Sequence, residues 1–228
     1  MSSTERAQRI TFSGSLVVCA VLTVVSTSLM PDFSGGSTDR LEAIAAAGTS
    51  ATVSAMLFTI AQLFFAIGVV GVARVVGDRA PVLAALGATA AVLSAFGHAV
   101  YGGVGLTMVD MAKDTANHEA YAAVLAAGET GLMIPFLVMG LLGTVLAIVL
   151  TAAALWRSRV AARWLPAALV GFVVLEFAGS ALSEWASYAA GLLFLVGFLS
   201  LAGIVARAPE RLRDPAPSRS GPFAEAVS

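Results

Sequence analysis

Residues 132–156 read LMIPFLVMGLLGTVLAIVLTAAALW, without one charged side chain, and residues 157–163 then read RSRVAAR. A helix needs about 20 apolar residues to cross the hydrocarbon core of a bilayer, and this run is long enough. Arginines gathered at one end of such a run are typical of its cytoplasmic side. The stretch therefore predicts a membrane-spanning helix and the side on which it ends.

Five further apolar runs have the same character, although the fourth of them is the shortest. The runs predict helices at 10–30, 49–73, 81–107, 164–181 and 185–206. Composition agrees, because 58% of the residues are hydrophobic and 12% are charged, against roughly 45–50% and about 25% in soluble domains. The sequence predicts an all-α membrane protein, a bundle of six transmembrane helices.

The charges outside these runs alternate along the chain. All but two of the 13 basic residues fall in residues 1–9, 74–80, 157–163 and 207–228, the exceptions being Arg40 and Lys113. The positive-inside rule therefore predicts that both termini are cytoplasmic and that the chain lies in a bacterial inner membrane. Residues 207–228, rich in proline, serine and charge, are predicted to be a disordered cytoplasmic tail. The other connections carry most of the acidic residues: Asp32, Asp39, Glu42, Asp110, Asp114, Glu119, Glu129 and Glu184.

The two long outer connections predict short interfacial helices. Asp39, followed three residues later by Glu42, imitates a capping box ahead of an alanine-rich segment that stops at Gly48. In the second connection Asn117 is a candidate cap for a helix that ends at Gly128. Neither connection is long enough to fold as a domain.

The layout resembles a group of uncharacterised six-helix integral membrane proteins of high-GC actinobacteria, which are domains of unknown function. The similar features are the Pro31-Asp32 exit from the first helix, GVVGVAR at 68–74 and ALWRSRVAARW at 154–164. The resemblance extends over nearly the whole chain to about Arg207. It implies the six-helix fold and no activity.

The third predicted helix carries small residues at four-residue spacing, which lets another helix approach closely. They are Ala91, Ala95, Ala99 and Gly103. The stripe is interpreted as a packing seam within one bundle, with a dimer interface as the alternative.

Glu176 lies about 18 Å from Trp164 at helical rise, deep in the predicted fifth helix. A carboxylate near the bilayer centre costs about 2.5–3.5 kcal/mol, so it should be protonated, partnered or facing water. Gln62 lies at a similar depth, and the two side chains could share hydrogen bonds. Glu176 either relays a proton or binds a cation or amine, or it is a neutral carboxyl that joins helices.

His98 shares a helix face with Ser94 and Tyr101, so the three predict a polar surface toward the bundle interior or an outer vestibule. A histidine there could change protonation near neutral pH. Its depth differs from that of Glu176 by about 9 Å, which favours an indirect link between them.

Asp110, Asp114 and His118 follow a four-residue spacing and are weak candidates for a metal site, with Glu119 or Glu184 as a possible fourth ligand. Side chains at this spacing spread along about 12 Å of a helix, so all three cannot easily converge. A solvated acidic loop is the simpler interpretation.

No phosphate-binding loop, zinc-protease or serine-hydrolase motif occurs, and two histidines are too few for paired haem ligation. We therefore expect no cofactor and no nucleic-acid partner, and an enzyme is the least favoured of the functional classes. Three hypotheses remain, in order: a membrane component that binds lipid, a partner protein or a second copy of itself; a proton-linked permease around Glu176; an enzyme using the outer acidic loop. A water-accessible cavity that reaches Glu176 would favour the permease. A dry bundle with a large exposed groove of small residues would favour the partner-binding component.

Overall fold

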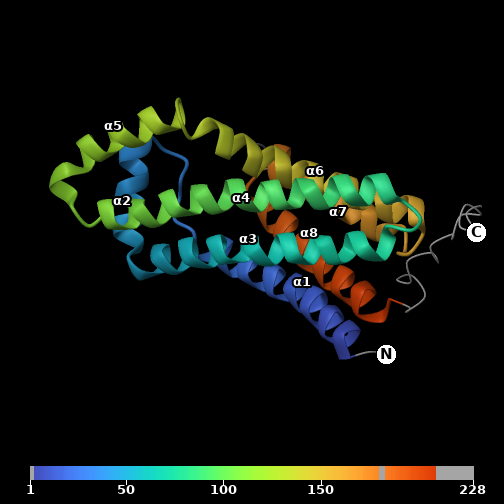
Figure 1. Ribbon diagram of the computed structural model, residues 1–228. Coiled ribbons are helices and arrows are strands. Elements are labelled where there is room, and N and C mark those ends of the chain that lie inside the picture. Colours follow the sequence, from blue (N-terminus) through green and yellow to red (C-terminus); the bar gives the residue numbers. More distant parts are fainter. Residues whose placement is uncertain (1–2, 180–182, 209–228) are drawn as a thin grey trace, which may run out of the picture.

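The computed structural model describes residues 3–179 and 183–208 of the chain. Its regular structure there is entirely helical (Figure 1), which confirms the all-α prediction. The elements in chain order are α1 Ser3–Leu29, α2 Ser37–Ala47, α3 Thr49–Val76, α4 Pro81–Met111, the 3₁₀ turn η1 Thr115–Asn117, α5 His118–Glu129, α6 Ile134–Ser158, α7 Trp164–Val174, the π-helical turn η2 Leu175–Gly179, and α8 Glu184–Arg207.

Helices α1, α3, α4, α6 and α8 are long and apolar enough to cross a membrane, so the chain is a membrane-embedded protein. Together α7 and η2 form a shorter apolar helix, Trp164–Gly179. At the helical rise this segment is about 24 Å long, less than a hydrocarbon core of about 30 Å. Residues 180 and 181 of the predicted fifth helix lie outside the described residues.

Two long helices extend beyond the apolar runs that predict them. Helix α1 begins at Ser3 instead of residue 10, and α4 continues to Met111 instead of residue 107. Hydropathy marks the part of a helix that can lie in lipid, whereas the helix itself continues for as long as its backbone hydrogen bonds do.

The helices run back and forth between two ends of the bundle (Figure 1). The start of α1, the α3–α4 turn, the α6–α7 turn and the finish of α8 lie at one end, which we call the basic end. Helices α2 and α5 lie at the other, the capped end. Between them the core is packed by large buried side chains, including Leu16, Leu155, Leu169 and Phe198.

A second, smaller hydrophobic cluster holds the two short helices at the capped end. It contains Leu41 and Ile44 of α2, Ala122 of α5, and Val109 of α4. An ion pair between Arg40 and Glu129 also joins α2 to α5. The capped end is therefore a packed layer over the ends of the long helices.

The capping box predicted at Asp39 is wrong. Helix α2 begins at Ser37 with Gly36 as its N-cap, so Asp39 lies in the first turn and accepts the Gly36 N–H at 2.8 Å. Asn117 precedes α5 at the N-cap, but its side chain donates to Asp114 at 2.8 Å and caps nothing. In both loops a local side-chain bond competes with the predicted cap.

The close contact between α4 and α6 uses residues other than most of the predicted small-residue stripe. A Cβ added at Gly97 would lie 2.4 Å from the Gly140 nitrogen, and one added at Gly143 would lie 2.9 Å from the Ser94 Cα. Of the predicted stripe, Ala91 is buried and Ala95 half-buried, whereas Ala99 and Gly103 are exposed. The seam between α4 and α6 therefore uses Ser94 and Gly97, which lie between members of the stripe.

Candidate functional site

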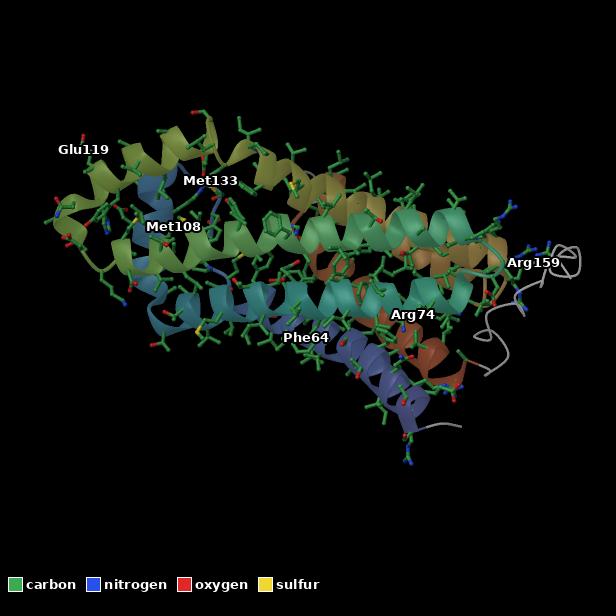
Figure 2. All side chains as sticks on the ribbon, in the orientation of Figure 1. Phe64, Arg74, Met108, Glu119, Met133 and Arg159 are labelled. Atoms are coloured by element: carbon green, nitrogen blue, oxygen red, sulfur yellow. The ribbon has the colours of Figure 1, made fainter. Side chains whose placement is uncertain are left out.

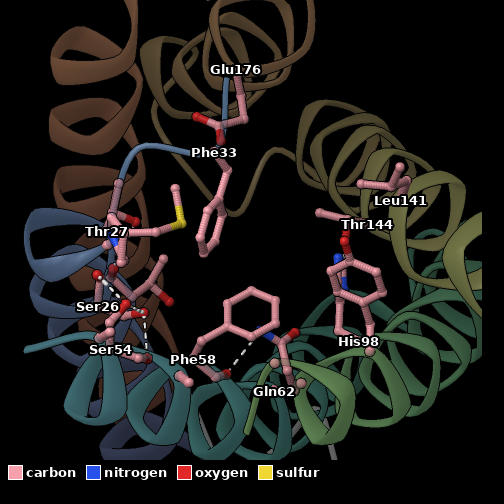
Figure 3. A pocket seen from close by; sticks show the side chains of 18 of the residues that line it. Ser26, Thr27, Phe33, Ser54, Phe58, Gln62, His98, Leu141, Thr144 and Glu176 are labelled. Atoms are coloured by element: carbon pink, nitrogen blue, oxygen red, sulfur yellow. Dashed lines mark hydrogen bonds between the residues drawn. The ribbon is translucent and has the colours of Figure 1, made fainter. Parts of the chain in front are cut away.

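A cavity of about 490 Å³ lies between the packed core and the capped end. Its wall comes from α1, α3, α4, α6, α7, η2 and α8, and from Arg40 and Ile44 of α2. Most of the wall is apolar, with rings from Phe33 and Phe58 (Figure 3) and from Phe65, Phe172 and Phe194. The wall also carries polar side chains, among them the neighbouring His98 and Thr144, and Arg40, Gln62, Tyr101 and Glu176.

Glu176 lines this cavity from the π-helical turn η2. Its side chain is accessible and, in Figure 3, lies above the ring of Phe33, which reaches into the cavity from the α1–α2 connection. A π-helical turn widens the backbone coil locally, and such turns occur frequently at functional sites. The sequence indicates the depth of Glu176 but carries no signal for this turn.

Gln62 lines the same cavity from α3, on the wall across from Glu176 (Figure 3). Its amide donates to the Phe58 carbonyl at 3.1 Å, one turn earlier in its own helix. The predicted hydrogen bond between Gln62 and Glu176 is therefore not formed, because the cavity separates the two side chains.

His98 belongs to a hydrogen-bonded group at the α4–α6 seam. The Ser94 hydroxyl lies 2.6 Å from the Thr144 hydroxyl and donates to the Gly140 carbonyl at 3.1 Å. The His98 Nδ1 lies 3.4 Å from the Ser94 Oγ and 3.5 Å from the Thr144 Oγ1. These contacts fix one edge of the imidazole, which also meets the Phe58 ring edge-on at 5.5 Å between centroids.

The Ser94–His98 pair resembles a hydroxyl nucleophile beside its base, but its burial argues against that role. Ser94 is 0% exposed, so no substrate atom can reach its oxygen without parting α4 from α6. We interpret the group as a polar contact that holds two helices in register and positions His98 on the cavity wall. Tyr101, one turn further along α4, lines the cavity as well.

Sequence reasoning missed several residues around the cavity. Ser26 of α1 and Ser54 of α3 each donate to the other's backbone carbonyl, at 2.9 and 2.8 Å. Thr144 and Thr151 are the two hydroxyl side chains of the apolar run 132–156, so the sequence does carry a signal for Thr144. Ser and Thr also satisfy their hydroxyls on their own helix, so the type of residue alone does not indicate such a contact.

The weak metal site at Asp110, Asp114 and His118 is wrong. Helix α4 ends at Met111 and η1 intervenes, so the four-residue spacing does not lie on one helix. Asp110 pairs with Lys113 at 2.7 Å, and the buried His118 ring makes a 3.1 Å hydrogen bond with the Ala112 carbonyl. Within residues 3–179 and 183–208, no three His, Cys, Asp or Glu side chains are grouped as metal ligands.

Asp114 is instead the centre of a small surface network. It accepts hydrogen bonds from the Asn117 amide at 2.8 Å and the Tyr121 hydroxyl at 3.0 Å. These two bonds lower the pKa of Asp114, and the bond to Asp114 raises the pKa of Tyr121. The hydrogen bonds stabilise the carboxylate form of Asp114 and the protonated form of Tyr121, so the two pKa values move in opposite directions. The loop is thus a structural junction between α4 and α5.

No protein-family model, curated protein or solved structure matches the chain. The resemblance to actinobacterial six-helix proteins therefore stays a prediction.

Proposed function

We propose that the chain binds an apolar or amphipathic small molecule, of the size of a lipid or smaller, within the membrane. The observation that supports this is the cavity, about 490 Å³ in volume, with its apolar wall and few separated polar groups. Binding sites for small molecules commonly enclose about 300–1,000 Å³ and have this composition. An apolar ligand would gain burial along the phenylalanine rings, and its polar group would face His98, Gln62 or Glu176.

In this proposal the chain is a bacterial inner-membrane protein that crosses the bilayer six times, with both termini cytoplasmic. Support comes from the arginines, because Arg74 near the end of α3 and Arg159 just after α6 lie at the basic end (Figure 2). Arg79 and Arg163 belong to the turns at the same end, where α1 also starts and α8 finishes. Trp164–Gly179 is the remaining crossing, the fifth in chain order. Its short length is accommodated by local thinning of the bilayer.

A cavity that Glu176 and His98 both line is the feature expected of a proton-linked permease, but the packing on its basic side favours ligand binding instead. A permease must open its site toward each side in turn. On the basic side of the cavity, the described residues form a packed core around Leu16, Leu169 and Phe198. Ligand binding requires only one route into the cavity, so it is compatible with this packed core without a conformational change on the basic side.

The proposal is tested by filling the cavity. Gly105 of α4 lines it, and a Cβ added there meets nothing within 4 Å, so Gly105→Phe projects a ring into the space without a backbone clash. Gly103→Phe is the matched control, because Gly103 is exposed on the same helix, also has open space, and does not line the cavity.

Binding is measured with a dansyl-labelled fatty acid, whose emission rises in an apolar site, on protein purified in mild detergent. We expect Gly105→Phe to weaken binding by about tenfold or more, a loss of roughly 1.4 kcal/mol, and Gly103→Phe to match the wild type. Lipids retained through purification and identified by native mass spectrometry should decrease in the same variant. Equal binding by both variants would show that the ligand lies elsewhere.

A further inference from the structure

The basic end of the bundle carries a second pocket, remote from the ligand cavity. It has a volume of about 360 Å³ and lies at the turn between α6 and α7. Three arginines supply its charge: Arg157, Arg159 and Arg163. Trp156, Ala161, Ala162 and Pro166 complete the wall, and no acidic residue contributes to it in the part of the chain that the structure describes.

The turn is built so that the arginines surround one space. Arg159 adopts a left-handed conformation with φ 54°, and its N–H bonds to the Leu155 carbonyl at 3.0 Å, which ends α6 and reverses the chain. The Arg163 guanidinium lies over the Trp156 ring, 5.6 Å from its centroid. Arg79, in the turn between α3 and α4, donates to the Ser158 carbonyl at 3.3 Å and so links that turn to the end of α6.

Arg74 lies at the same end but outside the pocket, 4.9 Å from the Phe12 ring, and donates to Gln8. Within the described residues, no carboxylate forms an ion pair with Arg157, Arg159 or Arg163. In that part of the chain, the positive charge of the pocket therefore has no carboxylate counterpart.

We propose that this pocket binds the phosphate of an anionic phospholipid headgroup. Guanidinium groups match phosphate oxygens in paired hydrogen bonds, and basic pockets between helix ends at the membrane surface suit such headgroups. A lipid is favoured over a free phosphate ion because the pocket lies at the ends of two apolar helices. Trp156 and Trp164 are 56% and 51% exposed, as interfacial indoles are, and further along α7 Val170 is exposed to acyl chains.

The test compares lipid binding by native mass spectrometry for the full chain in mild detergent. The probes are dioleoyl phosphatidylglycerol, dioleoyl phosphatidylcholine and inorganic phosphate. The variants are Arg157→Gln and Arg159→Asn, the second chosen because asparagine tolerates the left-handed conformation at that position. Arg74→Gln is the control, since it removes the same charge from the same end but outside the pocket.

We expect the wild type to prefer phosphatidylglycerol over phosphatidylcholine. Each pocket variant should weaken phosphatidylglycerol binding about fivefold, the effect of about one surface charge on an anionic lipid, while Arg74→Gln leaves it unchanged. Three results would overturn the proposal: undiminished binding by both pocket variants, an equal loss in Arg74→Gln, or displacement of the lipid by inorganic phosphate at equal concentration. The last result would identify a site for soluble anions.

Discussion

Substituting Gly97 with alanine tests whether close backbone contact holds α4 to α6. The added Cβ would lie 2.4 Å from the Gly140 nitrogen and 2.5 Å from the Phe136 oxygen. Carbon atoms normally approach other heavy atoms to about 3.5 Å, so the helices must separate by about 1 Å. Both obstructing atoms belong to the backbone, and neither can rotate away.

The expected loss is large for a single methyl group. Overpacking in a tight core typically costs about 1–3 kcal/mol, and separation would also stretch the Ser94 hydrogen bond to the Gly140 carbonyl, worth about 1 kcal/mol. We therefore expect Gly97→Ala to lower the free energy of unfolding by about 3–4 kcal/mol. Because Thr144 and Leu137 of α6 line the ligand cavity, the same change should weaken binding of the dansyl-labelled fatty acid.

The measurement is equilibrium unfolding by sodium dodecyl sulfate in mixed micelles, followed by circular dichroism. Gly103→Ala is the control on the same helix, because a Cβ there meets nothing within 4 Å. Alanine is a better helix former than glycine, so this control should be neutral or more stable by up to about 1 kcal/mol. A difference between the two variants below about 0.5 kcal/mol would refute the close-contact account of the seam.

Two further predictions concern polar groups. Ser94→Ala should destabilise the bundle by about 0.6–1.7 kcal/mol, the range of interhelical hydrogen bonds in membranes. Ser200→Ala is the control, because the Ser200 hydroxyl bonds to a carbonyl of its own helix α8, and it should change the free energy of unfolding little. Equal effects of the two variants in the same micelle titration would contradict this prediction. The hydrogen bonds from Asn117 and Tyr121 lower the pKa of Asp114 in the folded state, so their stabilisation is present above the unfolded value of about 3.8 and is lost as the pH falls through the lower folded pKa. The hydrogen-exchange protection factors of α5, which are corrected for the intrinsic pH dependence of exchange, should therefore fall in strong acid in the wild type. Asp114→Asn should already have lower protection factors at neutral pH, with little further change on acidification. Wild-type protection factors that stay constant down to that acidity would count against the network.

The predicted segments agree well with the observed helices because lipid solubility is a local property. The apolar stretch 132–156 becomes α6, Ile134–Ser158, and the stretch 49–73 becomes α3, Thr49–Val76. The hydropathy of each segment is a sum over its own residues, so no knowledge of neighbours is needed. Helix ends agree less well, as at Ser3 and Met111, because capping depends on local hydrogen bonds.

The candidate site was only partly predictable, because local sequence identifies polar residues within apolar runs but not which of them meet in the folded bundle. Glu176, His98, Gln62 and Tyr101 are conspicuous as polar residues within apolar runs, and the structure places all four around one cavity. Their grouping depends on the order of helices around the bundle, which spacing along the chain does not contain. The missing bond between Gln62 and Glu176 and the π-helical turn at Glu176 illustrate the difference.

By itself the sequence determined which segments are apolar enough to lie in a bilayer and where the arginines separate them. Only the tertiary structure decided which face of each helix packs inward. In water a buried face is more apolar than an exposed one, but lipid tails are as apolar as a protein core, so hydropathy carries no such signal. Close packing selects the face instead, and Gly97 therefore meets Gly140 while Gly103 on the same helix faces outward.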